Sequence, residues 1–91
     1  MNEPPLYRVG IKKPALKVIG KLPRPLANRI RQAIDGLATD PRPPGYKKLA
    51  IKDGLYRIRV GDWRIIYTIE DDKLIILVLR VGPRGGVYRN L

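Results

Sequence analysis

Three arginines lie on two neighbouring segments whose spacing would bring them together on one surface. Arg57 and Arg59 alternate with apolar residues in segment 55–60, and Arg64 follows in segment 63–69. Alternation places every second residue of a strand on the same face of a sheet. Guanidinium groups bind phosphate oxygens through paired hydrogen bonds and stabilise negative charge that develops in a transition state. The three arginines therefore predict a site for an anionic ligand.

Such a site could act on RNA without a metal ion or another cofactor. The 2′-hydroxyl of RNA attacks the adjacent phosphate once the two are held in line, so the protein must supply orientation and positive charge. The sequence has no Cys and no His, which removes thiolate metal sites, the usual zinc ligand and the usual general base. Guanidinium stays protonated at ordinary pH, so the arginines themselves are poor bases.

A tight turn between the two segments fixes how the arginines pair. Gly61-Asp62 separates the segments, and a glycine at the first central position suits a two-residue type II′ hairpin turn. That turn places Arg59 opposite Arg64 on neighbouring strands. Like charges in such positions are unfavourable, on a scale of roughly 0.2–1 kcal/mol per pair. A ligand-binding face is therefore favoured over a face that is charged only for solubility.

The third segment, 74–81, is apolar on both faces except at Arg80. This composition predicts an inner strand that is covered on both sides. A two-residue turn at Asp71-Asp72 would place Arg80 beside Trp63, and the chain leaving the strand would carry Arg84 back toward the arginines of the hairpin. A three-residue loop would reverse the two faces of this strand.

The upstream half of the chain is predicted to pack against the apolar side of this sheet. A short edge strand at 7–11 precedes a helix at 14–21, and a second helix starts after Pro23. The Pro-rich segment 40–46 then leads to a short strand or turn near 49–52. We therefore expect an α+β fold in the order β-α-α-β-β-β, with a helical hairpin on an antiparallel sheet of about four strands.

Length and charge limit the classes to which the protein can belong. The 91 residues suit one domain, 1–91, without disulfides or internal repeats. The net charge of +11 arises from 19 Lys and Arg against eight acidic residues, and it favours nucleic acid, an anionic membrane or an acidic protein as partner. The N-terminus lacks the apolar core of a signal peptide, and the longest aliphatic run, 74–79, is too short to span a bilayer. A soluble cytoplasmic protein is expected.

The hairpin and the C-terminal segment also resemble a known family. The stretch LYRIRVGDWRIIY at 55–67 and the closing pattern VGPR…VYR at 81–89 are similar to the RelE family of the RelE/ParE toxin superfamily. The resemblance covers almost the whole chain from Tyr7. It implies the toxin of a type II toxin-antitoxin system, a metal-independent endoribonuclease that cuts mRNA in the ribosomal A site by 2′-hydroxyl attack and so inhibits translation.

The resemblance further implies roles for individual residues. Arg57 and Arg59 match the family's two basic strand residues, and Arg64 matches the arginine that opens the next strand. Arg59 and Arg64 are expected to bind the scissile phosphate. Arg84 matches the basic residue after the last strand and would stabilise the leaving side. Tyr88 matches the C-terminal tyrosine that orients the substrate base, and it is the candidate general base.

The sequence departs from the family pattern in two places. Arg57 and Arg59 stand where members often have lysines, which makes proton abstraction by these side chains implausible but keeps phosphate binding. The second departure lies in the C-terminal part. Pro83 stands where His, Lys or Arg is common, and Gly85-Gly86 replace residues that are usually charged. The proline removes a potential cation, and the glycines loosen the link to Tyr88.

Eight further cationic side chains are candidates for contact with RNA or the ribosome. They are Lys13, Lys17, Lys21, Arg24, Arg31, Lys47, Lys48 and Lys52. The family also implies an acidic antitoxin, which would repress the operon by contacting operator DNA only as a complex with the toxin. This antitoxin could cover the arginines or displace segment 85–91, and Gly85-Gly86 favour displacement by acting as a hinge. No membrane partner is expected.

Two other functions stay open at the level of sequence. A ParE-like protein with the same fold would poison DNA gyrase through protein contacts, with its active features outside the arginines. A non-catalytic module would use the charge of +11 only to bind nucleic acid or an acidic partner. The set of three strand arginines with Arg84 and Tyr88 favours the ribonuclease over both.

Overall fold

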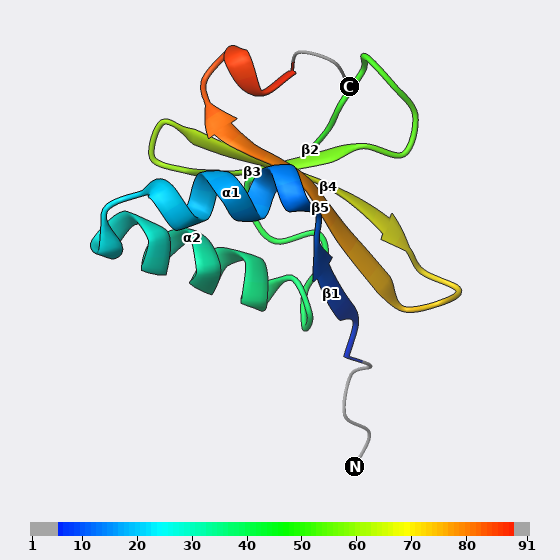
Figure 1. Ribbon diagram of the computed structural model, residues 1–91. Coiled ribbons are helices and arrows are strands. Elements are labelled where there is room, and N and C mark those ends of the chain that lie inside the picture. The colour runs from blue at the N-terminus through cyan, green and yellow to red at the C-terminus, as the bar shows by residue number, and fades with distance from the viewer. Residues whose placement is uncertain (1–5, 89–91) are drawn as a thin grey trace.

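Two helices cover one face of a five-stranded sheet in the computed structural model, which describes residues 6–88 (Figure 1). The elements in chain order are β1 (Arg8–Ile11), α1 (Lys13–Lys21), α2 (Arg24–Gly36), β2 (Lys47–Lys48), β3 (Tyr56–Val60), β4 (Trp63–Glu70), β5 (Ile75–Pro83) and the 3-10 helix η1 (Gly86–Tyr88). Across the sheet the strands run in the order β1-β5-β4-β3-β2. The predicted α+β class and the order β-α-α-β-β-β are confirmed.

The sheet differs from the prediction in being mixed and in having five strands rather than about four. β1 runs parallel to β5, with Arg8 opposite Ile75 and Ile11 opposite Val78. Parallel strands need a long crossover connection, and the two helices that follow β1 begin such a connection. β2 is the additional strand, and it forms at Lys47–Lys48 rather than near residues 49–52.

Both helices bury an apolar stripe against the same side of the sheet. Ala15 and Ile19 of α1 and Ile30 and Ile34 of α2 are at most 1% exposed. Each helix has a proline in its first turn, where the missing N–H group is not needed for helix hydrogen bonds. The sheet contributes Ile58, Ile65, Tyr67, Ile76 and Val78 to this core. Among residues 6–88, neither helix has the length and apolar character that crossing a bilayer requires.

A second, smaller apolar cluster lies on the opposite side of the sheet. Its buried members are Leu55, Ile66 and Val87, and Leu49, Leu79 and Tyr88 pack around them. Val87 and Tyr88 belong to η1, which contacts β5. The inner strand β5 is therefore covered on both sides, as its composition predicted.

An exposed network ties the Pro-rich loop to the far end of the β4–β5 hairpin. Both terminal nitrogens of Arg42 donate to the carboxylate of Asp71, at 3.2 and 3.0 Å. The Tyr7 hydroxyl donates to the same carboxylate at 2.7 Å. The hydrogen bonds from Arg42 and Tyr7 lower the pKa of Asp71. The Arg42 guanidinium also lies 5.5 Å from the centre of the Tyr56 ring, so this loop is held against the sheet.

Tyr67 is the basis of a prediction about alkaline stability. The side chain is fully buried, and its hydroxyl donates to the Pro41 carbonyl oxygen at 2.7 Å. Burial raises the pKa of Tyr67 well above its ordinary value of 10.0. The unfolded chain therefore loses this proton first, so stability that is present at neutral pH falls as the pH rises above about 10. Chemical denaturation between about pH 8 and pH 11 should show this fall.

Tyr67→Phe should make the alkaline decline less steep, although it lowers stability at neutral pH by about 1–3 kcal/mol because the Pro41 carbonyl loses its partner. Tyr46→Phe is the matched control, since Tyr46 is 37% exposed. The control should decline as steeply as the unmodified protein. An equally steep decline in Tyr67→Phe would show that Tyr67 does not cause it.

Candidate functional site

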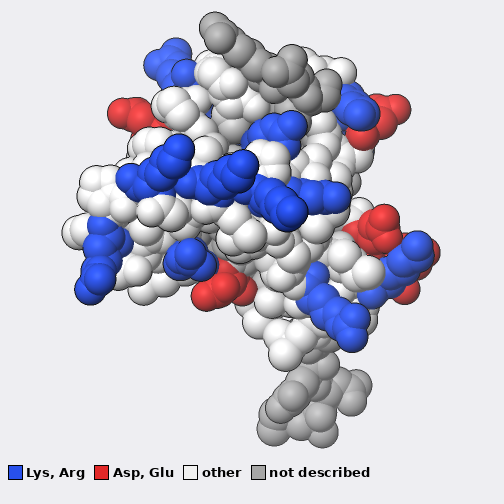
Figure 2. All heavy atoms as spheres, in the orientation of Figure 1, with Lys and Arg blue, Asp and Glu red and all other residues white. Residues whose placement is uncertain are grey.

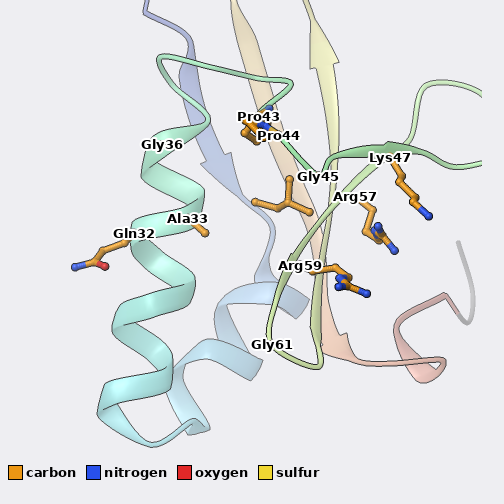
Figure 3. Close-up of a pocket in the computed structure, with 11 residues that line it drawn as sticks. Gln32, Ala33, Gly36, Pro43, Pro44, Gly45, Lys47, Arg57, Arg59 and Gly61 are labelled. Atoms are coloured by element: carbon orange, nitrogen blue, oxygen red, sulfur yellow. The ribbon is translucent and has the colours of Figure 1, made fainter.

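The β3–β4 hairpin brings the three predicted arginines onto one face of the sheet. Arg59 lies opposite Arg64, and Arg57 lies opposite Ile66, which confirms the register predicted from the turn. Gly61 in that turn has φ +59, a left-handed conformation that glycine adopts at no steric cost. Figure 3 shows the side chains of Arg57 and Arg59 pointing away from α2. We call Arg57, Arg59 and Arg64 the arginine face, and it lies on the side of the sheet opposite the helices.

Two of these arginines are largely buried. Arg57 is 9% exposed and Arg64 is 8% exposed, whereas Arg59 is exposed. The Nε atom of Arg57 is buried and has no hydrogen-bond partner among residues 6–88. Within the same range, both ion pairs involve the β4–β5 turn and neither involves the arginine face. Because a buried cation is unfavourable without a partner, this face is suited to an anionic ligand.

The turn between β4 and β5 is longer than predicted. It spans residues 71–74, and Trp63 pairs with Pro83 rather than with Arg80. Leu74 closes the turn at φ +54, which is uncommon for a leucine. Asp71 in this turn accepts hydrogen bonds from Arg42 and Tyr7, which lie in segments distant in the sequence. The predicted two-residue turn at Asp71-Asp72 is therefore wrong.

A β-bulge changes the direction in which Arg80 points. Ile66 pairs with Arg80 and Tyr67 pairs with Val78, so Leu79 is an extra residue in β5. Arg80 thereby lies on the same face as Ile66 and, one strand further, Arg57. The site residues predicted from sequence did not include Arg80. The sequence held no signal for this, because segment 74–79 is apolar at every position and so does not reveal where the alternation shifts.

Arg84 returns to the arginine face by way of the β3–β4 turn. Its backbone N–H donates to the Asp62 carbonyl oxygen at 3.1 Å. Asp62 lies in the turn between β3 and β4, next to the strand ends at which Arg59 and Arg64 pair. The chain therefore comes back toward these arginines as predicted, and the Arg84 side chain is exposed there.

Val87 fixes the C-terminal segment on the sheet. It is 5% exposed, and a Cβ atom added at Gly82 would lie 3.1 Å from the Val87 Cβ. Glycine at position 82 thus provides the space that Val87 occupies. Tyr88 packs, half-buried, on the same cluster, so its ring docks on the body of the protein. Segment 85–91 is the part that the antitoxin is predicted to displace, and its residues 89–91 lie outside the described residues.

The other predicted cationic residues separate into two groups. All are exposed: Lys13, Lys17 and Lys21 on α1, Arg24 and Arg31 on α2, Lys47 and Lys48 on β2, and Lys52 in the following loop. Figure 2 shows Lys and Arg side chains in a band that follows α1. The helical cations lie on the side of the sheet opposite the arginine face. Lys47 pairs with Arg57 and therefore belongs to the arginine side.

A cavity of about 750 Å³ opens beside β3. β2 pairs only with Tyr56 and Arg57, so the edge of β3 beyond Arg57 is not covered by β2. The walls include Gln32, Ala33 and Gly36 of α2 together with residues 43–45 (Figure 3). Ile58 lines the cavity between these walls.

The chemistry available at the arginine face is binding and stabilisation of negative charge. Two further side chains complete the set. Arg84 lies near the β3–β4 turn, and Tyr88 packs on the adjoining apolar cluster. Residues 6–88 contain no group of three or more His, Cys, Asp or Glu side chains that could hold a metal ion. The side chains present suit an ester of phosphoric acid whose own hydroxyl is the nucleophile.

Comparison with known proteins shows the family to which this chain belongs. The family described as "ParE toxin of type II toxin-antitoxin system, parDE" matches residues 9–88. The chain belongs to the RelE/ParE toxin superfamily. The resemblance seen in the sequence is therefore confirmed, and the protein is a RelE-like toxin of the type II class.

Relatives of this toxin carry RelE names. "Putative toxin RelE1" of Methanocaldococcus jannaschii is 32% identical over 87 residues, which cover 92% of this chain and 97% of the relative. The archaeal RelE-RelB complex from Pyrococcus horikoshii gives a TM-score of 0.78 at 34% identity, covering 88% of this chain and 97% of that chain. The RelBE2 toxin-antitoxin complex from Mycobacterium tuberculosis gives a TM-score of 0.75 at 26% identity, covering 88% and 93%. The arrangement of two helices on the sheet is thus shared with RelE structures.

Proposed function

We propose that this toxin is a ribosome-dependent mRNA endoribonuclease that cuts the codon in the A site and thereby inhibits translation in the cytoplasm. The observation that carries the proposal is the arginine face. Arg59 lies directly opposite Arg64, and the neighbouring Arg57 has a buried Nε without a partner among residues 6–88. Relatives named "Putative toxin RelE1" and "Toxin RelE" support a toxin of the RelE class.

In the proposed reaction, the RNA supplies its own nucleophile. The 2′-oxygen attacks the adjacent phosphorus, the bond to the 5′-oxygen breaks, and that oxygen takes a proton from water. Arg59 and Arg64 bind the scissile phosphate and stabilise the charge that develops on it. Arg84, near the β3–β4 turn, stabilises the leaving oxygen. Tyr88 holds the substrate base and, as its phenolate, accepts the proton of the 2′-hydroxyl.

The helical cations have a separate role in this proposal. Lys13, Lys17 and Lys21 recur every four residues of the exposed side of α1. Since they lie opposite the arginine face, they bind ribosomal RNA while the arginine face holds mRNA. The toxin would then lie between the ribosome and its substrate.

The test uses a reconstituted translation system with a defined mRNA. Primer extension should show cuts inside the A-site codon when toxin and ribosomes are both present. The same mRNA without ribosomes should stay intact. Intact mRNA on ribosomes that are saturated with toxin would reject the proposal.

A second candidate function follows from the ParE description of the matching family. A ParE-like toxin would inhibit DNA gyrase through protein contacts and would leave mRNA intact. Supercoiling of relaxed plasmid by gyrase, measured with and without the toxin, separates the two. Inhibited supercoiling together with uncut mRNA would favour the gyrase function.

We also propose that an acidic antitoxin binds this toxin and that the complex, not the toxin alone, contacts operator DNA. Two solved structures similar to this chain are RelE-RelB and RelBE2 complexes. A net charge of +11 would speed encounter with an acidic chain, and apolar residues of the antitoxin would hold the complex. The open edge of β3 and the adjoining cavity suit an extended segment of such a partner.

The antitoxin is expected to displace the C-terminal segment. Gly85, at φ +88, provides the hinge, and Val87 leaves its place above Gly82. Hydrogen exchange of the Val87 and Tyr88 amides should become faster in the complex, while β4 amides such as that of Ile66 stay protected. Slow exchange at Val87 combined with new protection of β3 would show instead that the antitoxin covers the arginine face directly.

A further inference from the structure

The bulge in β5 extends the arginine face by one strand. Lys47 pairs with Arg57, Arg57 with Ile66, and Ile66 with Arg80. Residues that are paired directly across a sheet point to the same face. Three cations from β2, β3 and β5 therefore lie in one row across the strands, separated by a single apolar residue of β4.

The bulge also supplies the contact that holds Arg80. The Nη1 atom of Arg80 donates to the backbone carbonyl of Leu79 at 2.9 Å. Leu79 is the extra residue, and its side chain is anchored in the second apolar cluster. Bulges are frequent beside active sites, where they redirect a side chain. Without the shift, strict alternation from Val78 would turn residue 80 toward the helices.

Arg80 has the electrostatic surroundings of the other arginines on this face. It is partly buried, and within residues 6–88 it takes part in no ion pair. Among residues 6–88, the one hydrogen bond of its guanidinium is the one to the Leu79 carbonyl. The second apolar cluster covers Ile66 on this face, so Arg80 lies at the border of that cluster.

We infer that Arg80 binds a phosphate next to the scissile one. The inference rests on the proposed function, because it takes RNA as the ligand of the arginine face. Arg59 and Arg64 form the neighbouring row, where the scissile phosphate lies.

The experiment measures binding of an uncleavable 2′-O-methyl RNA oligonucleotide by fluorescence anisotropy over a series of salt concentrations. Each phosphate contact with a single strand contributes about 0.7 to the slope of log K against log salt. Arg80→Gln removes the charge and keeps N–H donors on a shorter side chain. It should reduce the slope by about 0.7 and the affinity at 0.1 M salt by about five-fold. Arg80→Lys keeps the charge and should keep the slope.

The matched control is Arg29→Gln, because Arg29 is exposed on α2 and its loss lowers the net charge by the same amount. The control should keep the slope of the unmodified toxin. Equal slopes for Arg80→Gln and Arg29→Gln would overturn the inference, as would a lack of salt-dependent binding by the unmodified toxin. Thermal unfolding of each variant, followed by circular dichroism, verifies that binding is compared between folded proteins. This experiment measures RNA binding and not cleavage. Failure of the proposed nuclease activity would therefore appear in the primer-extension experiment on ribosomes and not in this one.

Discussion

Arg64→Gln is expected to slow mRNA cleavage on ribosomes by about 100- to 1,000-fold, as loss of one preorganised charge-stabilising group does in other enzymes. Arg64 is 8% exposed, so its guanidinium is fixed before substrate arrives. It lies opposite Arg59 on the neighbouring strand. Glutamine fills a similar volume and can still donate hydrogen bonds, but it does not carry the charge that the phosphate requires.

Single-turnover cleavage with excess toxin and stalled ribosomes measures this effect without contributions from product release. Arg29→Gln, on the helical side, should cleave at the rate of the unmodified toxin. The melting temperature of Arg64→Gln should be no lower, since an unpaired buried charge is removed. Cleavage within ten-fold of the unmodified toxin would remove Arg64 from the proposed mechanism.

Tyr88→Phe is expected to slow cleavage by about 100-fold or more while RNA affinity stays unchanged, because only the hydroxyl that accepts the proton is lost. The ring packs on the cluster around Leu55 and Ile66, and phenylalanine can pack there equally well. Tyr88→Ala should lose the same activity and also weaken RNA binding, since stacking of a base on an aromatic ring contributes about 1–3 kcal/mol.

Measuring cleavage rate and RNA affinity for both variants separates the two roles of Tyr88. Tyr46→Phe serves as control, because Tyr46 is exposed and lies outside the arginine face. A Tyr88→Phe variant that cleaves normally would leave base stacking as the role of this residue and would assign proton transfer to another group. Normal activity in Tyr88→Ala would exclude Tyr88 from the site.

The parts of the fold that sequence predicted well are governed by local interactions. Gly61-Asp62 specifies a two-residue turn, and the alternation on either side assigns each arginine to a face. The pairing of Arg59 with Arg64 follows from these features alone. The helices likewise follow from prolines at their starts and from apolar residues at helical spacing.

The register of β5 could not be obtained in this way, because it depends on contacts between distant segments. Asp71 is held by Arg42 from the Pro-rich loop, and Leu74 adopts a left-handed conformation that its residue type does not favour. The extra residue at Leu79 then changes which face Arg80 occupies. The sequence consequently predicted the positions of the arginines on β3 and β4 but not the face on which Arg80 of β5 lies.

The unpartnered Nε of Arg57 has a consequence for the energetics of the free toxin. A buried donor without an acceptor costs about 1–3 kcal/mol, whereas whole domains are stable by only about 5–15 kcal/mol. An anion that reaches this atom satisfies the donor, and the folded state gains stability in proportion to the occupancy of the site. Ligand binding and resistance to unfolding are therefore thermodynamically coupled through one guanidinium group, so the free toxin is less stable than its fold allows.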